Sequence, residues 1–118
     1  MTHYLLIDHG SRNTFAHQQL IQITNNLKVE KDIQISYAHL EIAEPFFVDV
    51  LEKLCQEKKE KIIILPLFIF AGKHLSKDIP QIIEKARFKH PQIQINLENA
   101  LGDSPLFTSS LSRIFNIT

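Results

Sequence analysis

Four short apolar segments, rich in β-branched residues, recur along the chain, and we expect each to form a strand. They are Tyr4 to Asp8, Ile33 to Leu40, Lys61 to Pro66 and Ile93 to Glu98. The third contains the unbroken apolar run Ile62 to Leu65, which is typical of a strand buried on both faces of a parallel sheet.

Between these segments, and after the last, apolar residues recur at helical spacing. They predict four helices, marked by Ala16, Leu20, Ile23 and Leu27; by Phe47, Val50, Leu51 and Leu54; by Ile79, Ile82, Ile83 and Ala86; and by Phe107, Leu111 and Ile114. Prolines and polar caps mark the helix starts. We expect first-turn prolines at Pro45, Pro80 and Pro105 and N-caps at Asp78 and Ser104.

Strand and helix alternate four times, which predicts an α/β fold: a four-stranded parallel sheet with helices on both faces, joined by right-handed crossovers. A unit of this kind commonly has strand order 2-1-3-4, as in half of a flavodoxin-like fold. Ligands bind where the order reverses, at the carboxyl ends of strands one and three. We expect residues 1–118 to form one domain.

Composition narrows the class of protein. Thirteen basic residues balance thirteen acidic ones, which gives no electrostatic basis for nucleic-acid or membrane binding. The single cysteine, Cys55, excludes an internal disulfide and a multi-cysteine metal site. No segment approaches about 20 consecutive apolar residues, the length of a membrane span. We therefore expect a cytoplasmic protein with one hydrophobic core.

Two histidines follow the strands that flank the expected switch point. His9 lies directly after the first strand, and His74 ends the segment that leaves the third. Glu41, just past the second strand, adds a carboxylate to the same edge. Two imidazoles and a carboxylate suit a borderline divalent cation. Each residue alone is as well explained as a hydrogen-bonded histidine or an exposed acid, and the shared edge is what favours a site.

Other polar residues have simpler explanations. Glu44 is best explained as a helix N-terminal acid. His39 points to the side of Glu41 if the strand continues that far, where it either widens the site or packs. His3, His17 and His90 lie at a strand start or on helix surfaces, and solvated side chains explain them.

The remaining candidates would contact a ligand. The apolar segment 67–70 continues past Pro66 and either contacts a flat apolar ligand, through Phe68 and Phe70, or packs against a helix or subunit. Hydrogen-bond donors and positive charge surround the histidines, which suits a carboxylate-bearing ring. These residues are Ser11, Arg12, Lys73 and Lys77, and Gly72 beside them is a further candidate for contact with the ligand. The glycines Gly10, Gly72 and Gly102 follow strands one, three and four, where a chain turns sharply or approaches a ligand.

Taken together, these segments resemble the short-form sirohydrochlorin chelatases, cobaltochelatases and ferrochelatases of the class II tetrapyrrole metal chelatases. The matching segments are residues 8–12, 40–45, 66–74, 78–80 and 101–102. The resemblance implies that His9 and His74 bind and insert the metal and that Glu41 assists them. It also implies a chelatase-like fold, a symmetric homodimer and insertion of Co²⁺, Fe²⁺ or Ni²⁺, with the metal as a substrate and no permanently bound cofactor.

The expected function is therefore insertion of a divalent metal into a sirohydrochlorin-type tetrapyrrole, for cobalamin or sirohaem biosynthesis. Two alternatives remain open. The same pocket would serve a non-catalytic carrier of metal or tetrapyrrole. A phosphoryl-transfer enzyme could instead use His9 as nucleophile, with Ser11, Arg12 and the next helix N-terminus holding phosphate, but it leaves His74 unexplained.

Overall fold

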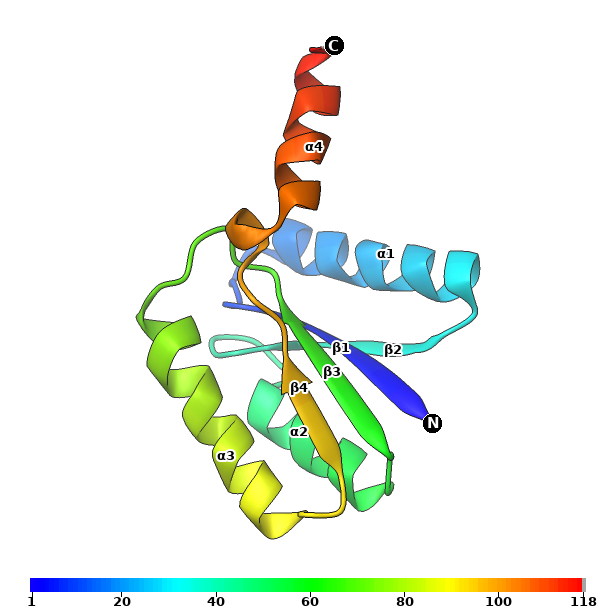
Figure 1. Ribbon diagram of the computed structural model, residues 1–118, viewed down its shortest axis with the longest axis vertical. Helices are drawn as coiled ribbons and strands as arrows, with labels where there is room; N and C mark the ends of the chain where they lie inside the picture. The colour runs from blue at the N-terminus through cyan, green and yellow to red at the C-terminus, as the bar shows by residue number, and fades with distance from the viewer. Residues whose placement is uncertain (118) are drawn as a thin grey trace.

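The chain forms one four-stranded sheet in which all neighbouring strands are parallel (Figure 1). The structure, a computed structural model, describes residues 1–117, and the side chain of His74 lies outside that description. The strands are β1 (Thr2–Asp8), β2 (Gln34–His39), β3 (Lys61–Pro66) and β4 (Gln94–Leu97). Their order is β2-β1-β3-β4. The predicted fold class and strand order are confirmed.

Three helices connect the strands and form layers beside the sheet, and a fourth follows the last strand and projects away from it (Figure 1). They are α1 (Thr14–Lys31), α2 (Phe47–Gln56), α3 (Ile79–Lys89) and α4 (Pro105–Phe115), with a π-helical turn η1 (His74–Asp78) and a 3₁₀ turn η2 (Leu101–Asp103). α1 covers one face of the sheet, and α2 and α3 cover the other. No helix within residues 1–117 is long and apolar enough to span a membrane.

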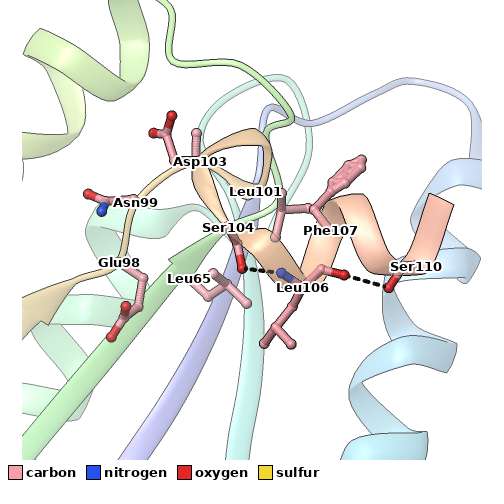
Figure 2. Close-up of a pocket in the computed structure, with 10 residues that line it drawn as sticks. Leu65, Glu98, Asn99, Leu101, Asp103, Ser104, Leu106, Phe107 and Ser110 are labelled. Carbon is pink, nitrogen blue, oxygen red and sulfur yellow. Dashed lines mark hydrogen bonds between the residues drawn. The ribbon is translucent and has the colours of Figure 1, made fainter. Parts of the chain in front are cut away.

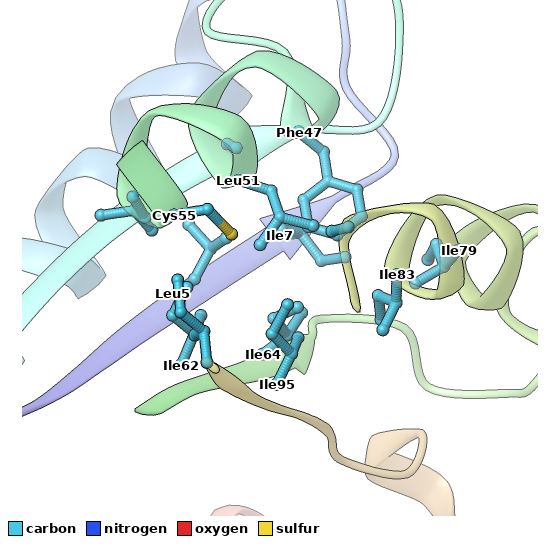
Figure 3. Packing of buried hydrophobic residues seen from close by; sticks show 14 of the residues in the cluster. Leu5, Ile7, Phe47, Leu51, Cys55, Ile62, Ile64, Ile79, Ile83 and Ile95 are labelled. Carbon is cyan, nitrogen blue, oxygen red and sulfur yellow. The ribbon is translucent and has the colours of Figure 1, made fainter. Parts of the chain in front are cut away.

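The main core lies between the sheet and the pair α2 and α3 (Figure 3). Ile62 and Ile64 of β3 belong to it and are fully buried, as is Phe47 of α2. Burying an isoleucine side chain contributes about 2 kcal/mol, so this layer dominates the hydrophobic stabilisation of the fold. A smaller cluster around Leu6 and Leu20 joins the other face of the sheet to α1.

The second face of β3 is less covered than its sequence predicts. Ile63 and Leu65, which alternate with the core residues, are half-buried rather than buried. The reason is the position of α4, which projects from the body of the molecule instead of lying on the sheet (Figure 1). None of the residues of α4, all of which the structure describes, is buried.

Four of the five predicted helix-start positions are confirmed. Pro80 and Pro105 lie in first turns, and the hydroxyl of Ser104 caps α4 by accepting a hydrogen bond from the Leu106 amide (3.2 Å). Pro45 precedes α2 rather than lying in its first turn. Asp78 occupies the N-cap position of α3 as predicted, but its helical backbone continues η1 into α3 and its side chain makes no capping hydrogen bond.

The position at which α2 begins also tests the prediction for Glu44. Glu44 is exposed and precedes the helix, so the prediction of a helix N-terminal acid is wrong.

The prediction that His3 and His90 have solvated side chains is wrong as well. His3 is buried, and its Nε2 is 2.8 Å from Ser36 Oγ. His90 bonds Glu52 through Nε2 (3.1 Å), and this hydrogen bond lowers the pKa of the Glu52 carboxyl.

The buried His3 generates a prediction about pH and stability. Burial, with Lys59 nearby, lowers the pKa of His3 below its ordinary value of 6.5. The unfolded chain then binds the proton more readily, so the contribution of His3 is complete above about pH 6.5 and is lost as pH falls toward its folded-state pKa. We expect the unfolding free energy to decrease in that window and His3→Gln to flatten the decrease. Urea titrations of both proteins at a series of pH values measure the unfolding free energy. The same dependence of that free energy on pH in the two proteins would contradict the prediction.

Candidate metal centre

Backbone hydrogen bonds hold the segments that leave β1, β2 and β3 together beyond the ends of the strands. The Leu40 amide donates to Asp8 O (2.8 Å), and the Glu41 amide donates to His9 O (3.1 Å). On the other side, the Leu67 amide donates to Ile7 O (2.7 Å). The loop after β1 is therefore flanked by the other two loops at the carboxyl edge of the sheet.

His9 and Glu41 meet at this edge, as the topology predicts. His9 Nε2 lies 3.0 Å from Glu41 Oε1. Their side chains are 44% and 51% exposed, so the contact is accessible to a large ligand. A carboxylate that accepts the N–H of an imidazole fixes the orientation and tautomer of the ring, which is the usual arrangement around a metal-binding histidine.

Gly10 makes the close approach of these two loops possible. Its φ of +102° lies in the region that side chains rarely adopt. A Cβ atom built at this position would lie 1.9 Å from the carbonyl oxygen of Glu41. The glycine predicted at this turn is therefore required both by its backbone conformation and by the space that the Glu41 backbone occupies.

The third predicted ligand, His74, is placed through its backbone alone. It begins η1, after the loop that leaves β3, and its side chain lies outside the described part of the structure. The role of His74 beside His9 and Glu41 therefore stays a prediction. Among the described side chains, no group of three or more histidine, cysteine and acidic residues is arranged to hold a metal ion.

Behind the candidate centre, three side chains form a hydrogen-bonded row. Asp8 and His39 are register partners on β1 and β2, and His39 Nδ1 lies 2.5 Å from Asp8 Oδ1. His39 Nε2 lies 2.8 Å from Nδ1 of His17 on α1. Because a carboxylate only accepts, His39 donates through Nδ1 to Asp8, and a single proton lies between His39 Nε2 and His17 Nδ1.

This row resolves the two alternatives for His39. Its side chain is 1% exposed, so it packs inside the protein and does not widen the site beside Glu41. Both ring nitrogens of His39 are satisfied, as a buried polar side chain requires. Since Asp8 precedes His9 and His39 lies two residues before Glu41, the bond between them fixes the spacing of the two loops that carry the centre.

Sequence reasoning missed His17, which is half-buried and bonded rather than solvated. Its ring also packs edge-on against Tyr37, with ring centroids 5.7 Å apart. A signal was present in the sequence: His17 lies one residue after Ala16 and three before Leu20, the helix positions that were expected to face the sheet. Histidine at such a flanking position can reach a polar strand residue.

The apolar segment after β3 divides into packed and exposed halves. Leu67 and Phe68 pack against the two hydrophobic clusters, whereas Phe70 is 80% exposed. The amides of Leu101 and Gly102 donate to Phe68 O (2.8 Å) and Ile69 O (2.7 Å). The packing alternative is confirmed for Leu67 and Phe68, and contact of the exposed Phe70 with a ligand stays a prediction.

The predicted polar contacts lie on the surface of the same loops. Arg12, Lys73 and Lys77 are exposed, and nothing lies within 4 Å of a Cβ built at Gly72. The Ser11 hydroxyl accepts a hydrogen bond from the Asn13 amide (3.0 Å), at the start of α1. Ser11 thus has a structural role in this turn, and contact of these residues with a ligand stays a prediction.

The contact between His9 and Glu41 is also compatible with direct binding of one metal ion. Two ligand atoms at about 2.1 Å from an ion lie about 3.0–3.4 Å apart when the angle between them is about 90–110°. The observed 3.0 Å between Nε2 and Oε1 falls in this range. The pair can therefore act together on an ion or as an imidazole with an orienting carboxylate.

Comparison with known proteins points to one family. The family model described as CbiX matches residues 3–116. The chain is 31% identical over 83 residues to the sirohydrochlorin cobaltochelatase of Sulfurisphaera tokodaii, covering 70% of this chain and 68% of the relative. It is 28% identical over 99 residues to the chloroplastic sirohydrochlorin ferrochelatase of Arabidopsis thaliana, covering 83% of this chain and 44% of the relative.

Solved structures give the same picture of the fold. A CbiX protein of Marinobacter aquaeolei, described as a putative cobalamin biosynthesis protein, has a TM-score of 0.82 and 25% identity, over 98% of this chain and 93% of its own. The sirohydrochlorin chelatase SirB of Bacillus subtilis, in complex with cobalt, has a TM-score of 0.80 and 24% identity, over 98% of this chain and 50% of its own. The chain spans 44–59% of the length of several curated relatives.

The geometry at Gly10 predicts the effect of a minimal substitution. Gly10→Ala places a methyl group against the Glu41 carbonyl and forces a side chain into a positive φ, so we expect a loss of more than about 2 kcal/mol of unfolding free energy. Gly72→Ala is the matched control, because its Cβ meets open space, and should change stability by less than about 1 kcal/mol. Equal losses of unfolding free energy for Gly10→Ala and Gly72→Ala in urea titrations would show that the close approach of Gly10 to the Glu41 carbonyl does not limit stability.

The buried row predicts strong coupling between Asp8 and His39. In a double-mutant cycle of Asp8→Ala and His39→Phe, we expect a coupling free energy of about 1–3 kcal/mol, because Asp8→Ala leaves His39, which is 1% exposed, without the acceptor for its Nδ1. The exposed bond between Lys59 and Gln34 (3.2 Å) is the control and should couple by less than about 0.5 kcal/mol. Chemical denaturation of the four proteins of each cycle measures both. Additive effects at Asp8 and His39 would refute the coupling.

Proposed function

This chain belongs to the CbiX family, and on that premise we propose that it inserts a divalent metal ion into sirohydrochlorin, for cobalamin or sirohaem biosynthesis. The observation that carries the proposal is the accessible contact between His9 and Glu41, 3.0 Å apart at the carboxyl edge of the sheet. It joins an imidazole and a carboxylate, the two group types expected for a borderline divalent ion.

Insertion exchanges two pyrrole N–H protons for one divalent ion, so the protein must deliver the ion to one face of the ring and accept protons. In the proposed mechanism, His9 and His74 hold the metal and accept the protons as it is transferred. Glu41 orients the His9 ring or takes a proton from it. The partial exposure of His9 and Glu41 supports this mechanism, because a flat macrocycle must approach both.

The ring itself would lie against the loops at this edge. The exposed Phe70 offers an aromatic surface for the macrocycle. Arg12, Lys73 and Lys77 offer positive charge to its carboxylates, and Ser11 and Gly72 offer further donors. The electrostatic attraction is local, because the chain as a whole carries no net charge.

The proposal also covers the metal that is inserted, the oligomeric state of the chain and its location in the cell. Relatives named as cobaltochelatases and ferrochelatases support Co²⁺ and Fe²⁺ as substrates, and Ni²⁺ is the third candidate. Two copies of the chain form a homodimer. The chain works in the cytoplasm, where its one cysteine, the buried Cys55, stays reduced.

Absorbance assays test the activity. The purified chain is incubated with sirohydrochlorin and with Co²⁺, Fe²⁺ (without oxygen) or Ni²⁺, and the spectral change is compared with a no-enzyme control. We expect accelerated insertion, a loss of at least about 100-fold in kcat/KM for His9→Ala and His74→Ala, and a loss of about 10- to 100-fold for Glu41→Gln.

His90→Ala is the matched control, because His90 bonds Glu52 on a different part of the molecule and should leave insertion unchanged. Near-normal turnover of folded His9→Ala or His74→Ala would refute the site. Stoichiometric binding of metal or tetrapyrrole without accelerated insertion would identify a carrier instead. Hydrolysis of a phosphomonoester by the chain would favour phosphoryl transfer.

A further inference from the structure

Ile42 has an unusual backbone conformation directly beside the candidate centre. Its φ is +77°, in the left-handed region that β-branched residues rarely adopt. The other described non-glycine residues with a positive φ are Asp32, Lys58 and Asn116. Each of those follows the end of a helix, where this conformation is common. Ile42 lies in the loop between β2 and α2, so the end of a helix does not explain it.

A tight turn accounts for the positive φ. The Ala43 amide donates to Glu41 O (2.9 Å), a hydrogen bond that spans Ile42 alone. A bond between residues two apart, around a central φ near +75°, is the pattern of the γ-turn that is rare and strained. The same Glu41 oxygen lies against Gly10, and the Glu41 amide donates to His9 O (3.1 Å). The turn is thus part of the close packing between the two loops that carry the centre.

The turn itself does not require isoleucine. Glycine adopts a positive φ without steric cost, and asparagine adopts it more readily than a β-branched residue does. Packing does not explain the side chain either, because Ile42 is 49% exposed and belongs to neither hydrophobic cluster. Strained residues gather at active sites and ligand contacts. An apolar side chain kept in a strained turn, and left half in water, therefore points to contact with a ligand.

A macrocycle at the centre needs apolar contacts there. A groove of about 730 Å³ lies at the base of α4, where Leu101, Leu106 and Phe107 line it (Figure 2). Neither His9 nor Glu41 is among the described residues that line this groove, so it is not formed around the metal-binding pair. Apolar contacts to a ring at the centre therefore come from side chains on the loops that carry the pair.

Ile42 is well placed for such a contact. It follows Glu41 directly in the chain, so the two Cα atoms lie about 3.8 Å apart. In the proposed reaction the ion enters through the middle of the ring, so the macrocycle lies over His9 and Glu41 with its carboxylates at the rim. The neighbours of the pair then face the apolar inner surface of the ring. Ile42 is 49% exposed and the Glu41 side chain 51%, so both are open to a flat ligand.

We propose that Ile42 contacts the inner, apolar surface of the tetrapyrrole, and that the strained turn keeps its side chain beside the metal-binding pair. The proposal rests on the proposed function and adds a substrate-contacting residue to it. Isoleucine displaces water from the face of the ring but offers no ligand atom to the metal. Loss of the side chain should therefore weaken binding of the ring without changing delivery of the ion.

Substitutions that keep the turn and remove the side chain test the proposal. Ile42→Gly and Ile42→Asn both accept a positive φ, so the urea midpoint of unfolding should be unchanged or higher. Each should raise KM for sirohydrochlorin by about 5- to 30-fold, the effect of losing one apolar contact. Their kcat and KM for Co²⁺ should stay within about 2-fold of wild type, because binding alone is lost. Ile42→Val keeps a β-branched apolar side chain and should behave as wild type.

Ile23→Ala is the matched control, because Ile23 is 45% exposed on α1 and its loss should leave KM for sirohydrochlorin unchanged. Titration of the full chain with sirohydrochlorin alone, followed by absorbance, measures ring affinity without metal insertion. Unchanged ring affinity and KM in folded Ile42→Gly and Ile42→Asn would overturn the role of Ile42 alone. So would a loss of kcat that follows a lower urea midpoint, because Ile42 would then be only structural.

The proposed function is tested separately by the wild-type chain. Failure of that chain to bind sirohydrochlorin would overturn both the chelatase proposal and the role of Ile42. Binding without insertion would overturn the chelatase proposal alone. In that case, weaker binding of the ring by Ile42→Gly would still support the contact, and equal binding would refute it.

Discussion

β1 pairs with β2 on one side and with β3 on the other, so the chain leaves three neighbouring strands at the same edge of the sheet. This parallel pairing brings His9 and Glu41 together although 31 residues separate them in sequence, because each lies just past the end of its strand. Backbone hydrogen bonds continue beyond the ends of the strands, so the loops that follow β1, β2 and β3 lie side by side in the same order as the strands. The candidate centre thus depends on strand register, and every contact that fixes register also positions the centre.

The row from Asp8 through His39 to His17 is one such contact formed by side chains. It joins two neighbouring strands and the helix that covers them, and its middle member is shielded from water. A buried polar side chain stabilises a fold when all its groups are paired and destabilises it when one is not. The row therefore penalises any shift of β2 against β1. A shift of one residue would separate the pair and would move Glu41 away from His9.

Much of this arrangement is readable from the sequence. Apolar periodicity gives the strands and helices, and the rules of parallel sheets give the order β2-β1-β3-β4 and the meeting of His9 with Glu41. The rest depends on side-chain direction. His39 is buried where its Nε2 meets Nδ1 of His17. These two residues are 22 positions apart, and the apolar periodicity of the sequence does not predict a contact between them. Similarly, the periodicity of α4 shows that one side is apolar but not what that side faces.

The candidate centre and the core occupy different parts of this fold. His9, Glu41 and Phe70 lie on loops beyond the strands, whereas the side chains of Ile62, Ile64 and Phe47 lie in the core between the sheet and helices α2 and α3. Exposed side chains on these loops can therefore be replaced with little loss of stability, whereas Gly10 cannot, because its backbone conformation and its contact with Glu41 require glycine. Asp8 and His39 are the exception, since they belong to both parts. A substitution at either of these two residues therefore changes both the stability of the fold and the position of the loops that carry His9 and Glu41.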